Sequence, residues 1–167
     1  MHNAGRTLET CLESIRPHAD LIVAVEGRFC DFHVPRSTPH STDGTVEILK
    51  RYADKIIFAE DRPQREMRDL YLVGHRGDHY FVIDGDEELQ GDFSKSEIGE
   101  APVWAVPLRE PFRSDQLCLR IFQHVPGIHH GPGQLPVTGR GTVMDGAHFP
   151  VQVAQSFWLR HLKEERR

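Results

Sequence analysis

The sequence has few of the features that mark membrane, secreted or nucleic-acid-binding proteins. It contains three cysteines, none in a CxxC pair, and no apolar run approaches the roughly 18 residues that a membrane-spanning helix needs. Acidic residues outnumber basic ones, and the net charge of −5 argues against nucleic acid or a membrane surface as a partner. We therefore expect a cytoplasmic protein without a transmembrane segment.

The chain does contain enough apolar sequence for a folded core. Its 167 residues show neither an internal repeat nor a low-complexity tract. This length is typical of one domain with a single core. We therefore expect one α/β domain over residues 1–167.

Helix-like and strand-like patterns alternate through the first half of the chain. Such alternation favours a mostly parallel sheet that is flanked by helices. No strand pattern precedes the first helix, so we expect the first strand to be missing. An open sheet edge favours pairing with another chain, such as a second copy in a homodimer. The expected helices lie within 3–15, 41–52 and 64–74, and the expected strands are 21–25, 55–59 and 80–83.

The second half of the chain has a different pattern. Two further strands are expected at 103–108 and 117–122, so the sheet becomes mixed toward the C-terminus. Dense Pro and Gly residues over 126–141 indicate a loop. Apolar residues spaced through 151–167 indicate a closing helix.

An acidic motif follows the strand expected at 80–83. Asp84 and Asp86 flank a glycine, and on an extended chain their side chains point the same way. Two carboxylates with an open approach suit a divalent cation that also holds substrate phosphates. The alternative is an ordinary solvated turn, because Asp is common enough in this chain to give about one Asp-x-Asp by chance.

Several motifs occur in the order in which one enzyme family has them. Over roughly residues 3–89 the chain resembles the family 2 glycosyltransferases, which have the GT-A (Rossmann-like) fold. The resemblance implies that 1–89 is the nucleotide-binding half and 90–167 the acceptor-side half. The motifs are Asn-Ala-Gly-Arg-Thr-Leu-Glu from Asn3, Ile-Val-Ala-Val-Glu ending at Glu26, Ser-Thr-Asp-Gly-Thr from Ser41, and Ile-Asp-Gly-Asp ending at Asp86.

The family resemblance also implies a ligand set. It makes Asp84 and Asp86 the motif that holds Mn²⁺ or Mg²⁺ and a nucleotide-diphospho-sugar donor, with Asp86 the more direct metal ligand and Asp84 nearer the ribose. The other nucleotide-binding positions that it implies are Glu26 at the nucleobase, Asn3 and Asp43 at the nucleotide side of the cleft, and Arg68 at the diphosphate.

The implied reaction moves a sugar, with inversion, to a hydroxyl group of a carbohydrate, lipid-linked or protein acceptor. A carboxylate or a histidine must take the proton of that hydroxyl. Asp115, Glu110 and His130 are candidates for this catalytic role. Asp115 is preferred because it precedes an expected strand, directly after the loop expected to face the acceptor.

Two other classes of function remain open. The first is a glycosyltransferase-like domain that binds a nucleotide or a partner without catalysis, which the missing first strand favours. The second is a zinc-binding structural module, because Cys30, His33 and His40, or His129 and His130, are ligand types that suit Zn²⁺. No second Cys/His pair stands at a typical spacing, which weighs against zinc.

Overall fold

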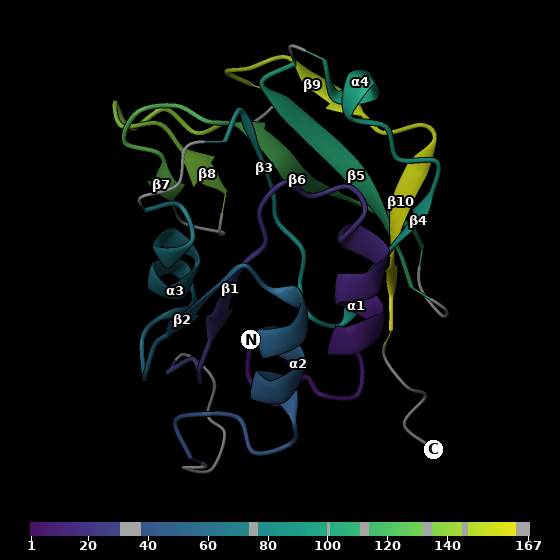
Figure 1. The fold of residues 1–167 in the computed structure, drawn as a ribbon. Coiled ribbons are helices and arrows are strands. Elements are labelled where there is room, and N and C mark those ends of the chain that lie inside the picture. Colours follow the sequence, from purple (N-terminus) through teal and green to yellow (C-terminus); the bar gives the residue numbers. More distant parts are fainter. Residues whose placement is uncertain are drawn as a thin grey trace.

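Helices and strands alternate first, and strands dominate after residue 79 (Figure 1). The computed structural model describes residues 1–30, 38–73, 77–99, 101–110, 114–131, 135–144 and 147–162. The helices are α1 (Leu8–Ile15), α2 (Thr45–Tyr52), α3 (Gln64–Leu70) and α4 (Lys95–Ile98). The strands are β1 (Val23–Glu26), β2 (Lys55–Phe58), β3 (His79–Phe81), β4 (Glu87–Gly91), β5 (Val103–Arg109), β6 (Gln116–Gln123), β7 (His129–His130), β8 (Pro136–Val137), β9 (Val151–Val153) and β10 (Phe157–His161).

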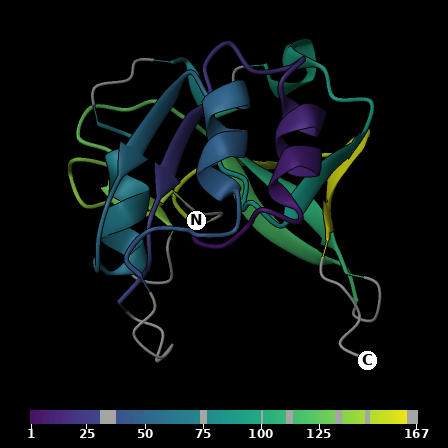
Figure 2. The same cartoon turned by 60° about the horizontal axis from the view of Figure 1, so that its bottom comes forward.

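The first half forms a small parallel sheet between helices. β1 and β2 pair in parallel, and α1 and α2 lie side by side over one face of the pair (Figures 1 and 2). Leu8 and Leu12, four residues apart on α1, pack with Ile48 and Leu49 of α2. α3 covers the other face of β1 through Met67. The helices and strands expected between residues 3 and 83 are therefore confirmed, with shorter bounds.

A larger sheet holds most of the second half. Its hydrogen-bonded order is β3-β6-β5-β10-β4, and β9 also pairs with β5. Its core centres on β5, β6 and β10, where Val106, Ile121 and Leu159 are completely buried. β4 lies beside α1, and the N–H of Leu89 donates to Ser14 Oγ at 3.0 Å. The carboxylate motif lies in the turn between β3 and β4, where this sheet meets α1.

The expected GT-A fold, a mostly parallel sheet flanked by helices, is wrong for this chain. The main sheet is mixed and curls into half a barrel. β6 runs antiparallel to both its neighbours, β3 and β5, and β4 runs antiparallel to β10. Helix–strand alternation predicts parallel pairing only where helices provide the crossovers. Most connections after β3 are too short for such crossovers, and most later strands pair antiparallel, whereas β9 and β10 pair in parallel with β5.

The expected ending of the chain is also wrong. Residues 151–161 form β9 and β10 instead of a helix, while 163–167 lie outside the described residues. Phe157 and Leu159 are buried whereas Trp158 and Arg160 are more exposed, which is the two-residue alternation of a strand. The 126–141 stretch, expected as loop only, carries the short β7–β8 pair.

Two expected absences can be compared with the structure. No helix in the described part of the chain is long and apolar enough to cross a membrane. No disulfide joins Cys11, Cys30 and Cys118 in the part of the chain that the structure describes. Cys11 is buried in α1, and its burial raises the pKa of the thiol to about 12. Its sulfur therefore remains a protonated thiol at neutral pH.

The position of β10 in the core gives the first testable prediction. Leu159 is fully buried, whereas Leu117, in β6 of the same sheet, is 62% exposed. Leu159→Ala is expected to lower the free energy of unfolding by about 2–5 kcal/mol because it leaves a cavity. Leu117→Ala should change it by no more than about 0.5 kcal/mol. Urea unfolding measures both, and equal losses would contradict the burial of β10.

Candidate functional site

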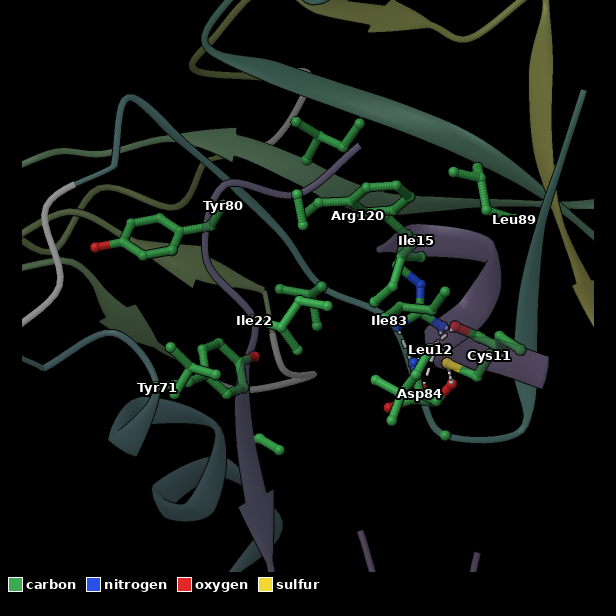
Figure 3. Close-up of a pocket in the computed structure, with 18 of the residues that line it drawn as sticks. Cys11, Leu12, Ile15, Ile22, Tyr71, Tyr80, Ile83, Asp84, Leu89 and Arg120 are labelled. Carbon is green, nitrogen blue, oxygen red and sulfur yellow. Dashed lines mark hydrogen bonds and ion pairs between the residues drawn. The ribbon is translucent and has the colours of Figure 1, made fainter. Parts of the chain in front are cut away.

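One buried arginine joins two carboxylates of the acidic motif. Arg120 on β6 donates from Nη1 and Nη2 to Asp84 Oδ2, each at 3.2 Å, and also pairs with Glu87 Oε1. Arg68 on α3 donates to Asp84 Oδ1 at 2.9 Å from the other side. The N–H of Asp84 donates to Glu87 Oε2 at 2.9 Å, which closes the turn. Figure 3 shows Asp84 near Arg120 at one end of a cavity.

The two carboxylates respond in opposite ways to burial. Burial opposes ionisation of Asp84, but Arg120 and Arg68 outweigh it and hold the pKa of this carboxyl below its ordinary value. Burial raises the pKa of Glu87 to about 7, although Arg120 acts against the shift. Burial lowers the pKa of Arg120, and the two carboxylates more than compensate, so its net shift is upward. Asp84 is therefore the ionised member of the pair at neutral pH.

Asp86 faces a different partner. His161, near the end of β10, lies with Nε2 2.8 Å from Asp86 Oδ2, and the N–H of Leu162 donates to Asp86 O at 2.7 Å. The Asp86 side chain is 40% exposed. The sequence interpretation missed His161, because it treated 151–167 as a helix distant from the motif. Only the alternation of Phe157 and Leu159 could have placed His161 on a strand.

Glu26 is completely buried and supports the segment that leads to α2. Its Oε1 accepts the N–H of Ser41 at 2.8 Å, and its Oε2 lies 3.0 Å from His40 Nδ1. His40 Nε2 lies 3.0 Å from Glu60 Oε1. The hydrogen bond that His40 donates to Glu26 is the largest of several effects that raise the pKa of His40. Glu26 was expected to contact the nucleobase, but both of its carboxylate oxygens already have partners within the chain.

Asn3 and Asp43 hold the same region together. Asn3, with a left-handed φ of 50°, accepts the N–H of Thr42 on Oδ1 at 3.1 Å. Asp43 accepts the N–H of Gly5 at 2.8 Å and both polar groups of Thr45 at the start of α2. Burial alone would raise the pKa of Asp43, but these hydrogen bonds lower it below its ordinary value. The structure brings Asn3 and Asp43 together beside Asp86.

Two cavities connect these predicted positions. The larger, of about 1230 Å³, is lined by Asn3, Arg68, Asp84 and Asp86, and also by Arg120 (Figure 3). The smaller, of about 530 Å³, is lined by Asn3, Asp43 and Asp86. The implied metal and diphosphate positions are therefore neighbours in space. Glu26 lies beneath this region without lining either cavity.

The candidate proton acceptors lie apart from one another. Asp115 lines neither cavity and forms an exposed ion pair with Arg109, with Oδ2 and Nε 3.4 Å apart. Glu110 Oε1 lies 3.5 Å from Nδ1 of His161, the residue that contacts Asp86. His130 is buried, with Nδ1 3.0 Å from Asp69 Oδ1. Only Glu110 is next to the acidic motif.

The residues of the zinc alternative are only partly described. His33 lies outside the described residues, and Cys30 is exposed. His40 and His130 already contact carboxylates. Over the described ranges, no group of three or more His, Cys, Asp and Glu side chains could hold a metal ion. A zinc module thus gains no support from these residues.

The buried ion pairs of Arg120 give the second prediction. Arg120→Met preserves the bulk of the side chain but leaves Asp84 and Glu87 without their shared cation. Breaking such a buried group is expected to lower the free energy of unfolding by about 3–5 kcal/mol. The matched control is Arg160→Met, which breaks the pair of the 53% exposed Arg160 with Glu88 and should cost about 0–1 kcal/mol. Chemical denaturation measures both, and a loss for Arg120→Met no larger than the control's would contradict this role.

The raised pKa of Glu87 gives a prediction about pH. Because its folded pKa of about 7 exceeds the ordinary value of 4.5, stability from Glu87 is fully present below 4.5 and is lost as the pH rises through about 7. Glu87→Gln cannot ionise, so the variant should lose less stability than the wild type between about pH 5 and pH 8. Urea unfolding at several pH values measures the difference. Stability curves that run parallel across this range would contradict the raised pKa.

The comparisons with known proteins leave the family open. The acidic motif, its two arginines and the Asp86–His161 contact are consistent with more than one chemistry. No protein-family model matches the chain, and no curated protein matches it. A functional conclusion for this chain therefore depends on the side chains of the site.

Proposed function

We propose that this chain binds a nucleotide-diphospho-sugar together with Mn²⁺ or Mg²⁺ and transfers the sugar, with inversion, to a hydroxyl acceptor. The acceptor would be a carbohydrate, a lipid-linked molecule or a protein. The observation that carries the proposal is the accessible Asp86 carboxylate beside His161, at the rim of a cavity that also contains Asp84 and Arg68. Cavities of this size accommodate nucleotide-sized ligands.

The donor atoms around Asp86 fit such a cation. A carboxylate oxygen is the ligand that Mn²⁺ and Mg²⁺ prefer, and His161 Nε2 lies within reach of the same position. In the described part of the chain no third His, Cys, Asp or Glu joins them. One or two protein ligands suffice for these cations when substrate phosphates supply others. Once bound, the cation would offset the charge on the departing diphosphate.

The side chains of the chain would orient the donor and accept a proton. Arg68 lines the cavity and would donate to diphosphate oxygens, while Asp84 holds its guanidinium in position. Without the cation, the contact with His161 Nε2 would hold Asp86 in position for it. Glu110 is nearer to this group than Asp115, so we assign to Glu110 the uptake of the acceptor proton ahead of Asp115.

A second candidate is a domain that binds the nucleotide without catalysis. Glu26, Asn3 and Asp43 are already engaged in hydrogen bonds within the chain, which favours a structural role for these three predicted contacts. A binding domain would need only the diphosphate and metal contacts. For both candidates we propose a reducing, cytoplasmic setting, because the three cysteines are widely spaced in the sequence and form no CxxC pair.

Thermal unfolding with nucleoside diphosphates tests the proposal. UDP, GDP, ADP, CDP and TDP would each be added with and without Mn²⁺. At about 100 times its Kd, a ligand that binds only the folded chain adds about 2.7 kcal/mol, which corresponds to a rise of several degrees in Tm. We expect one nucleotide to raise the Tm in a Mn²⁺-dependent way. Asp86→Asn and His161→Ala should abolish the Mn²⁺-dependent part of the rise.

The matched control is Asp61→Asn, which removes a carboxylate of 53% exposure that lines neither cavity. It should leave the Mn²⁺-dependent rise unchanged. No rise with any nucleotide would refute both candidates. A rise without sugar transfer or hydrolysis from the matching nucleotide-sugar would leave the binding domain and exclude the enzyme.

A further inference from the structure

The larger cavity extends from the acidic motif along the edges of two strands that belong to different sheets. β1 and residues 21–22 line one side, and β3 with residues 82–83 lines the other. β1 pairs with β2 alone, and β3 is the end strand of the large sheet and pairs with β6. Both strands therefore turn an open edge toward the same space.

The open edge of β1 can be assigned residue by residue. The carbonyls of Ile22 and Glu26 accept hydrogen bonds from the side of β2. Because backbone groups alternate in direction along a strand, those of Val23 and Val25 point the opposite way, toward the cavity. Within the described chain, the N–H and C=O of Val23 and the N–H of Val25 have no backbone partner.

The open edge of β3 follows the same rule. The carbonyl of Asp78 accepts the N–H of His124 at 2.9 Å, and the N–H of Val82 donates to the carbonyl of Arg120 at 2.8 Å. The intervening Phe81 therefore directs its backbone groups away from β6 and toward the cavity. Peptide groups in protein interiors are almost always hydrogen-bonded. Two open edges that face the same cavity, in the part of it lined by apolar side chains, thus indicate a peptide ligand.

Met1 already occupies one end of this space. Its nitrogen donates to the carbonyl of Val25 at 2.7 Å, and its carbonyl accepts the N–H of Gly27 at 2.8 Å. These are two consecutive bonds of a parallel ladder with β1. Burial lowers the pKa of the Met1 amine, since the charged form is poorly solvated there.

Both faces of the space are covered by helices. Leu12 and Ile15 of α1 line it on one side, and Met67 and Tyr71, in and just after α3, line it on the other (Figure 3). A strand placed there would be buried on both faces. Such strands are continuously aliphatic and do not alternate between apolar and polar residues.

We propose that this cavity is the binding site for one extended aliphatic peptide strand, which runs parallel to β1, pairs with β1 and β3 on its two sides, and is joined to the nitrogen of Met1. As an amide, that nitrogen keeps its hydrogen bond to Val25 and loses its buried charge. About five residues, at about 3.3 Å each, span the length of β1. The strand would unite the two sheets. The strand would occupy the part of the cavity along β1 and β3 and leave the end lined by Arg68, Asp84 and Asp86 for the donor of the proposed function. The inference does not rest on that function.

The test adds a peptide to the full chain. One protein carries about five alternating Val and Ile residues before Met1, and a matched protein carries the same extension with Pro at alternate positions. Pro lacks the N–H that a ladder requires. The aliphatic extension should raise the Tm by about 5 °C or more, and the Pro extension should not. Hydrogen exchange should show new protection at the N–H groups of Val23, Val25 and Phe81.

Each other outcome overturns the proposal. Equal Tm values for the two extensions, or no protection at both β1 and β3, would show that the cavity does not bind a strand. If the free peptide gave the same Tm rise and protection as the fused one, the required link to Met1 would be wrong. If the rise appeared only in a dimer on size-exclusion chromatography, the strand would come from a second copy. Nucleotide binding is measured separately, so failure here leaves the proposed function untouched.

Discussion

The arrangement of the site depends on the buried guanidinium of Arg120. It is the point at which β6 is tied to the turn between β3 and β4, through Asp84 and Glu87. Two carboxylates this close repel each other unless a cation lies between them. Arg120 supplies that cation from the middle of the large sheet, and Arg68 adds a second from α3. The acidic motif is therefore held by both sheet and helix, with Asp86 left accessible beside it.

How much the sequence predicted depended on the range of the interaction. The helical spacing of Leu8 and Leu12, and the apolar run that ends at Glu26, predicted local elements correctly because local periodicity determines them. Strand partners were not predictable in this way. β6 lies between β3 and β5. Its pairing with β3 joins residues such as Tyr80 and Phe122 that are far apart in the sequence, and no local pattern encodes such a contact. The expectation of a mostly parallel sheet extended the helix–strand alternation of the first half of the chain to the second half, where it does not hold.

The predicted site residues also differ in how far the sequence could define their partners. Asp84 and Arg68 could be paired in advance only through the family resemblance, and the structure brings them within 2.9 Å. Glu26, Asn3 and Asp43 lie where the chain needs hydrogen-bond acceptors for unpaired N–H groups ahead of α2. A polar residue at such a position has a structural task whether or not a ligand binds. Sequence alone could not separate these two tasks, and it offered no signal for His161.

The contact between Asp86 and His161 joins residues 75 positions apart, one in the middle of the chain and one near its end. During synthesis the first helices and the β1–β2 pair can form while β10 is still inside the ribosome. The imidazole reaches Asp86 only when β10 has paired with β4 in the register that aligns His161 with Glu87. A slip of one residue would turn the imidazole to the opposite face of the sheet. Partly made chains and misregistered ones would thus carry the acidic motif without its histidine.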